Sequence, residues 1–203
     1  MSGAKRLALL RHGVTEWNRQ GRIQGRTDIP LDEEGRRRLD GLSLPEEWRA
    51  AALHASPLSR AVETAERLGG GRTVRRDPRL AEMGWGDWEG RRGVDLRADP
   101  QSGYRDLEEW GWNFRPPGGE SPAEVRERLS GWLADLARMA EPAHLAVTHV
   151  GVIRVLLAMA WGWPFRGAPP FRVKRDRLYA LALDPDGTLR PVSPPEGDRL
   201  PCA

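Results

Sequence analysis

Short apolar runs alternate along this chain with segments of helical periodicity, and this alternation constrains the fold more than any other feature. Each apolar run is too short for a helix and predicts a buried strand. Strands separated by helices are typical of parallel sheets covered on both faces. We therefore expect an α/β fold, a three-layer α/β/α sandwich with a mostly parallel central sheet. The expected strands are 7–10, 51–55, 73–75, 145–148, 171–173, 178–183 and 189–192, and the expected helices are 32–42, 59–68, 104–110, 121–139 and 152–160.

Several element boundaries carry local signals. Asp32 is suited to cap the helix that follows it. Ser121 and Glu124 have the spacing of a capping box, with Pro122 at the first helical position. Asp186-Gly187 predicts a hairpin turn between the last two strands. These signals make the 121–139 helix and the final hairpin the best-defined elements.

The length of 203 residues predicts one domain, 1–203, without a linker or internal repeat. Two stretches lack clear periodicity. The first, about 84–120, is rich in Trp and Gly and is expected to form a lid-like insertion with one short helix. The second, from about 193, is rich in Pro and is expected to be a loose tail.

Cysteine usage and hydropathy predict the compartment. Cys202 is the only cysteine, which excludes an internal disulfide framework. No apolar run approaches the roughly 20 residues of a membrane span. The first motif begins at Arg11 and leaves no room for a signal peptide. We expect a cytoplasmic protein, a monomer or a homodimer, with no membrane partner.

The charge distribution argues against a nucleic-acid partner. Lys and Arg number 32, Asp and Glu 29, and the pI is about 9.6. The only lysines are Lys5 and Lys174, so 30 of the basic residues are arginines. Acids are interspersed with them, as where 32–34 precede 36–38. Mixed signs on a helical face are typical of a solvated surface, so we expect no nucleic-acid binding.

Polar side chains follow three of the predicted strands. Arg11 and His12 follow the first, Arg60 comes shortly after the second, and His149 follows the 145–148 strand. In open α/β sheets ligands bind beyond the carboxyl ends of the strands, so these residues should converge. Guanidinium groups match phosphate oxygens, and positive charge lowers the pKa of a neighbouring histidine. We expect His12 to be a neutral nucleophile that forms a phosphohistidine, with Arg11, Arg60 and His149 stabilising the transferring group.

The leaving alcohol also needs a proton. Glu82 begins the aromatic stretch, and burial against Met83 and Trp85 would raise its pKa, while the arginines would oppose that rise. The alternative is a solvated loop glutamate. No group of side chains has metal-ligand spacing, so we expect no metal and no cofactor.

Ordered sequence blocks resemble the histidine phosphatase superfamily, in its phosphoglycerate-mutase-like branch. The first block reads LLRHGVTEWN, and the matching blocks are 9–18, 21–31, 56–65, 80–90, 116–121 and 148–154. The resemblance implies the same α/β/α sandwich. It also implies roles, which are His12 as nucleophile, Glu82 as proton donor, Arg11, Arg60, His149 and Asn18 on the phosphate, and Gln24 and Gly25 in the loop that touches the substrate.

Within that family the chain is most similar to the α-ribazole-5'-phosphate phosphatases. The 84–120 segment is shorter than the basic insertion of the mutases, and Val150 replaces the glycine usual after the second catalytic histidine, narrowing the substrate pocket. We therefore expect a metal-independent phosphomonoesterase that acts on a small phosphorylated metabolite, α-ribazole-5'-phosphate or a sugar phosphate. A 2,3-bisphosphoglycerate-dependent phosphoglycerate mutase and a non-catalytic phospholigand-binding module remain the alternatives.

Overall fold

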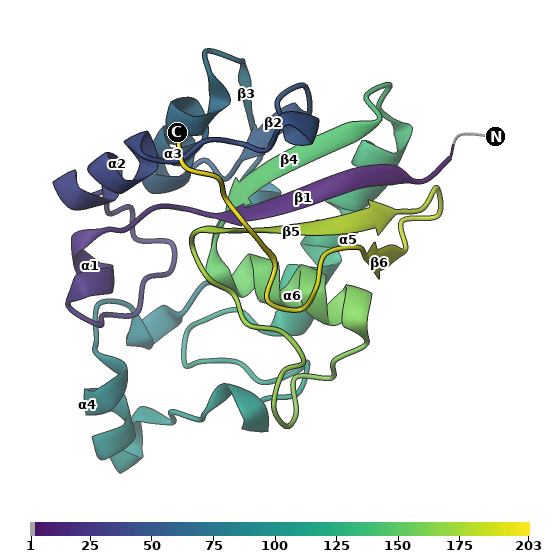
Figure 1. Cartoon of the computed structure of the whole chain (residues 1–203). Helices are drawn as coiled ribbons and strands as arrows, with labels where there is room; N and C mark the ends of the chain where they lie inside the picture. Colours follow the sequence, from purple (N-terminus) through teal and green to yellow (C-terminus); the bar gives the residue numbers. More distant parts are fainter. Residues whose placement is uncertain (1–2) are drawn as a thin grey trace.

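A seven-stranded sheet with helices on both faces organises the chain (Figure 1). The computed structural model describes residues 3–203. The strand order is β3-β2-β4-β1-β5-β6, and β7 also pairs with β5. The strands are β1 Lys5–Arg11, β2 Ala52–Ala55, β3 Val74–Arg76, β4 Ala143–Thr148, β5 Arg177–Leu183, β6 Leu189–Pro191 and β7 Asp198–Arg199.

The sheet has a parallel half and an antiparallel half. β3, β2, β4 and β1 run parallel, whereas β5 pairs antiparallel with β1, β6 and β7. The register aligns Arg11 with Thr148 and Ala55 with Val147. The carboxyl ends of β1, β2 and β4 therefore meet at one edge, which confirms the α/β prediction and places the following residues together.

The helices form two layers. The main ones are α2 Glu33–Asp40, α3 Ser59–Gly69, α5 Pro122–Arg138 and α6 Val150–Trp161, and the short ones are α1 Glu16–Arg19 and α4 Gly93–Ala98. Side chains of β1 alternate between two cores. Leu10 packs with α2 and α3, whereas Leu7 and Leu9 pack with α5 and α6. Burial on both faces confirms the three-layer sandwich.

Two of the predicted caps are present. The Asp32 side chain accepts a hydrogen bond from the Gly35 N–H, and Ser121 and Glu124 form a reciprocal capping box. At the start of α3 the hydrogen-bond acceptor comes from a distant part of the chain. The Asp28 carboxylate accepts hydrogen bonds from both the backbone N–H and the hydroxyl of Ser59. The predicted ends of these helices agree with the structure to within about two residues.

The 84–120 segment packs through its aromatic side chains. Trp88, Trp85 and Trp110 are buried in the core on the α5–α6 side, with ring centroids 5.4 to 6.4 Å apart. The predicted helix over 104–110 is wrong, because only a 3₁₀ turn at Leu107–Glu109 forms there. Ring packing rather than backbone periodicity determines the path of the segment, so helical spacing does not describe it.

Two further predictions differ from the structure. No strand forms over 171–173, because Phe171 packs edge-to-face on Trp163 instead of pairing in the sheet. The segment after Ser193, expected to be loose, carries β7 and buries Leu200 beside α2 and α3. Its prolines exclude a helix but leave neighbouring residues free to pair along a sheet edge.

Candidate active site

A cavity of about 370 Å³ opens where the carboxyl ends of the parallel strands meet. It brings together most of the residues selected from the sequence, namely Arg11, His12, Asn18, Gln24, Glu82 and Val150. Arg60, His149 and Gly25 do not line it. The rest of the wall consists of Arg22, Ile23, Trp85, Arg97, Tyr104, Asp106, Leu107, Glu108, Trp110 and Arg154.

His12 follows β1 and is almost fully buried, with 3% of its surface exposed. Its Nδ1 lies 2.7 Å from the carbonyl oxygen of Gly13. A carbonyl oxygen can only accept, so Nδ1 carries the proton and Nε2 keeps a free lone pair. Burial, then His149, Arg60 and Arg11, lower the pKa of His12 well below its usual value. A neutral imidazole with a free Nε2 is a competent nucleophile.

His149 lies next to His12, with ring centroids 5.0 Å apart and a 55° tilt. Its Nε2 is 2.7 Å from Ser56 Oγ, which also accepts the Leu58 N–H. The Ser56 hydroxyl can therefore donate to Nε2, which leaves the His149 proton on Nδ1. That Nδ1 is buried and has no partner among the described residues. Burial and three arginines lower the pKa of His149, so this ring too is neutral.

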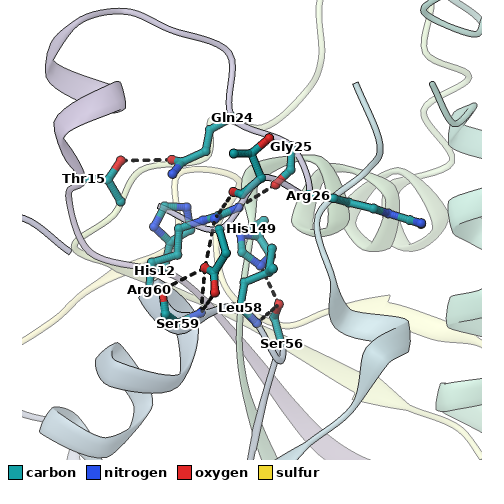
Figure 2. A network of polar contacts seen from close by, with 12 residues as sticks. His12, Thr15, Gln24, Gly25, Arg26, Ser56, Leu58, Ser59, Arg60 and His149 are labelled. Carbon is teal, nitrogen blue, oxygen red and sulfur yellow. Dashed lines mark hydrogen bonds and ion pairs between the residues drawn. The ribbon is translucent and has the colours of Figure 1, made fainter. Parts of the chain in front are cut away.

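Arg60 is fully buried on α3 and supports the loop that carries Gln24 and Gly25. Its terminal nitrogens donate to the carbonyl oxygens of Gly25 at 2.7 Å and Thr27 at 3.0 Å. Figure 2 shows this network next to the rings of His12 and His149. Gly25 has no room for a Cβ, which would overlap the Glu89 carboxylate. The structure thus places Gly25 against Arg60 rather than on the cavity wall.

Glu82 is the buried acid of the cavity, with 1% of its surface exposed. Its two oxygens accept the N–H groups of Met83 at 2.8 Å and Gly151 at 3.2 Å. Burial raises the pKa of Glu82 more than these bonds and the charges of Arg60 and Arg11 lower it. A carboxyl group with a raised pKa can hold a proton near neutral pH and act as a general acid.

Arg11 supplies positive charge to the cavity without an ion-pair partner among residues 3–203. Its Nε is buried and unpaired. Burial, followed by the charges of Arg175 and Arg154, lowers the pKa of Arg11 to about 9. An anion in the cavity would neutralise this concentration of positive charge and satisfy the free donors.

Asn18 and Gln24 form a small amide cluster on the cavity wall. The Asn18 Nδ2 donates to Gln24 Oε1 at 3.2 Å, and Thr15 Oγ lies 3.0 Å from the same oxygen. This arrangement leaves Gln24 Nε2 buried with no partner. A free amide N–H₂ at the wall is a ready donor to a ligand oxygen.

Sequence reasoning missed the outer wall of the cavity. Arg154 lies on α6 four residues after Val150, a spacing that puts both on one helix face and was readable from the sequence. Arg97, Asp106 and Glu108 come from the aperiodic segment, where no sequence pattern places them. Together these residues place both positive and negative side chains around the outer part of the cavity.

Among residues 3–203, no three His, Cys, Asp or Glu side chains are close enough to hold one metal ion. Within the same residues, every helix is too short or too polar to cross a membrane.

Comparisons with known proteins agree with this geometry. The sequence model of the histidine phosphatase superfamily (branch 1) matches residues 7–190. A probable phosphoglycerate mutase GpmB of Cronobacter sakazakii is 38% identical over 77% of this chain and 74% of its own length. Glucosyl-3-phosphoglycerate phosphatase of Mycobacterium tuberculosis is 33% identical over 82% and 79%. The structure of a putative α-ribazole-5'-P phosphatase from Escherichia coli, 27% identical, superimposes with a TM-score of 0.74 over 96% of this chain and 98% of its own.

Proposed function

The chain belongs to the histidine phosphatase superfamily (branch 1), and from that membership we propose that it is a phosphomonoesterase working through phosphorylated His12. The observation that carries the proposal is the hydrogen bond from His12 Nδ1 to the Gly13 carbonyl. It leaves Nε2 unprotonated on a cavity that also holds a buried carboxyl group. A nucleophile and an acid on one wall are what a two-step phosphoryl transfer needs.

In the first step, His12 Nε2 attacks phosphorus and the bond from phosphorus to the ester oxygen breaks. The proton of Glu82 passes to the leaving alkoxide, and the phosphoryl group stays on the ring. Arg11, Arg60, Asn18 and the Nδ1–H of His149 are the proposed donors to its oxygens. Their unpaired groups, Arg11 Nε, Arg60 Nε and His149 Nδ1, support this assignment.

In the second step, a water molecule attacks the phosphohistidine. Glu82, now a carboxylate, accepts the water proton, the bond from nitrogen to phosphorus breaks, and inorganic phosphate leaves. Gln24 Nε2 and the neighbouring Gly25 loop are proposed to contact the substrate, with Val150 narrowing the pocket above the ring. The chemistry uses only these side chains and water.

We propose that the alcohol part of the substrate is a sugar-containing metabolite, such as α-ribazole-5'-phosphate or a sugar phosphate. Trp85, Trp110 and Tyr104 offer ring faces, and Asp106 and Glu108 offer acceptors to hydroxyl groups. Two of the relatives, named for phosphatases of glucosyl-3-phosphoglycerate and of α-ribazole-5'-phosphate, support this class.

A mutase is the second candidate, because the GpmB relative named above carries that designation. Both signs of charge line the outer cavity, where Asp106 is paired with Arg97 at 2.6 Å and Arg22 and Arg154 add positive charge, so the choice between the two rests on activity. A phosphate-release assay across α-ribazole-5'-phosphate, sugar phosphates, nucleotides and 3-phosphoglycerate separates the two. We expect phosphate release with a sugar-containing substrate preferred. Conversion of 3-phosphoglycerate that depends on 2,3-bisphosphoglycerate, with little phosphate released, would establish the mutase instead. Binding of phosphoesters without turnover would establish the binding module.

We also propose that the chain is a single domain, 1–203, that works in the cytoplasm as a monomer or a homodimer. The single cysteine, Cys202, is exposed and unpaired, which fits a reducing compartment. The 84–120 segment would act as a lid because it supplies one wall of the cavity. Light scattering of the purified protein measures the oligomeric state, and a higher oligomer would contradict the proposal.

A further inference from the structure

A second cavity lies on the other side of Arg11 from the catalytic one. Its volume is about 610 Å³, and it is bounded by the end of β1, by α2 with the turn after it, and by the 172–176 loop before β5. Among residues 3–203, only Arg11 lines both cavities. The two spaces are therefore separate but share one guanidinium group.

The second cavity contains basic side chains without acidic partners. Elsewhere the arginines of this protein are mostly paired, in the 21 ion pairs found among residues 3–203. The side chains of Arg172, Lys174 and Arg175 make none of these pairs, although all three line the cavity. The one acid on the wall, Asp176, is 3.7 Å from Arg199. Such a group of free cations is suited to an anion.

Arg175 is the strongest sign that a ligand belongs here. Its Nε and one terminal nitrogen are buried and have no hydrogen-bond partner in the described chain. Burial and the nearby Arg38 lower its pKa to about 10, so the group is charged at neutral pH. Buried guanidinium nitrogens without hydrogen-bond partners are costly, and an anionic ligand would remove that cost.

Apart from Arg38, which is paired with Glu34, the remaining wall of the cavity is apolar. Val14, Leu39, Leu42 and Val173 face the same space as the cations. An inorganic anion would leave this surface in contact with water, whereas an anion with an apolar or ring-shaped body would cover it. The volume is in the range of small-molecule sites.

We propose that this second cavity binds a phosphorylated metabolite, with its phosphate on Arg175 and Lys174 and its apolar body on Leu39 and Leu42. The site is distinct from the catalytic cavity and does not rest on the proposed hydrolysis. Because both anions would draw on Arg11 and repel each other, occupation of one site weakens binding at the other, and the effect is reciprocal. The site thus offers a route by which a second metabolite inhibits turnover.

The test uses phenylphosphonate, a non-hydrolysable anion with an apolar ring, in isothermal titration calorimetry. One equivalent of orthovanadate first occupies the catalytic cavity. We expect the vanadate-loaded protein to bind one phenylphosphonate, and methylphosphonate about tenfold more weakly. R175Q, and separately R172Q/K174Q, which alters exposed side chains that the fold does not need, should each weaken binding at least about tenfold. R76Q/R190Q, with the same charge change on a remote surface, should not weaken it.

Three results would overturn the proposal. The first is phenylphosphonate binding that vanadate abolishes and R175Q leaves unchanged, which would place the ligand in the catalytic cavity. The second is an equal loss of binding in R76Q/R190Q and in R172Q/K174Q, which would indicate a general charge effect. The third is equal affinity for phenylphosphonate and methylphosphonate, which would show that an apolar body does not contribute to binding.

Discussion

The four histidines of this protein form two buried pairs that look alike and differ in chemistry. The rings of His12 and His149 are 5.0 Å apart and tilted by 55°, and those of His54 and His144 are 5.2 Å apart and tilted by 52°. All four side chains are at most 3% exposed. Burial and ring pairing alone therefore do not distinguish a reactive histidine from a structural one.

The partners of the ring nitrogens distinguish them. His54 Nε2 and His144 Nδ1 are bonded to each other at 3.1 Å, and Trp132 packs edge-on against His54. His12 Nε2 is free on a cavity lined with arginine. The first pair lies within strands β2 and β4, and the second follows the ends of β1 and β4. Position at the carboxyl edge gives the second pair access to a ligand.

Replacing one member of each pair should give the largest contrast. His12→Ala should lower kcat/KM for p-nitrophenyl phosphate by on the order of 10⁴-fold or more, because it removes the proposed nucleophile. His54→Gln should leave kcat/KM within about twofold, since it removes a contact remote from the cavity. Steady-state assays of both purified variants measure this contrast. Comparable losses in the two would erase the distinction.

The acid assigned to the catalytic region should show a dependence on the leaving group. Glu82→Gln should slow hydrolysis of an alkyl phosphate by about 10²- to 10⁴-fold, because an alkoxide leaves poorly without a proton. Nitrophenolate needs no such help, so p-nitrophenyl phosphate should lose far less. Rates for a series of phosphoesters with leaving groups of rising pKa test this, and a uniform loss across the series would exclude the role.

The pair formed by His54 and His144 should make the free energy of unfolding depend on pH. Burial lowers the pKa of His54 to about 4, below its unfolded value near 6.5. Between these values the unfolded chain binds a proton that the folded chain does not, so stability is present above pH 6.5 and is lost as pH falls toward 4. The loss from this group reaches at most about 3 kcal/mol.

Urea unfolding of the wild-type protein and of His54→Gln at several pH values measures that loss. The wild-type protein should become less stable more steeply below pH 6.5, and the variant should lack about one proton of that dependence. His12 and His149 also have lowered pKa values and remain in both proteins, so they cancel in the comparison. His144, whose pKa burial also lowers, is bonded to His54, so the difference between the curves reports the His54–His144 pair. Parallel curves would show that His54 is not the titrating group.

The smallest effect is expected from Ser56, which is bonded to the second ring of the proposed catalytic pair. Ser56→Ala removes the bond to His149 Nε2 and should lower kcat by about tenfold with little change in KM. Ser56→Thr should keep the hydroxyl group and restore most of the rate. A change in KM alone, or no rescue by threonine, would mean that Ser56 does not act through His149.

The inner part of the site was predictable because it depends on topology. Arg11 and His12 directly follow one apolar run and His149 another, and parallel pairing brings such positions to one edge. The sequence identified Glu82 as a candidate acid, but it did not show how deeply the side chain is buried. That burial depends on the close approach of Gly151. A Cβ at that glycine would overlap the carboxylate. Local sequence carries no information on such a close approach.

The outer part of the site was not predictable in the same way. Arg97, Asp106 and Glu108 are brought to the cavity by a segment that Trp88 and Trp110 anchor in the core. Indole packing has no sequence period, so no pattern gave their positions. The start of α3 is similar, since its partner, Asp28, lies 31 residues earlier in the chain than Ser59. Contacts between distant segments determine these features.

Isolation of the phosphorylated enzyme tests the central claim most directly. The protein is mixed with ³²P-labelled substrate, quenched in alkali, in which phosphohistidine survives, digested and mapped. We predict acid-labile label on the peptide that contains His12, with label present in His54→Gln and absent from His12→Ala. Label on any other residue, or full substrate hydrolysis by His12→Ala, would contradict the account.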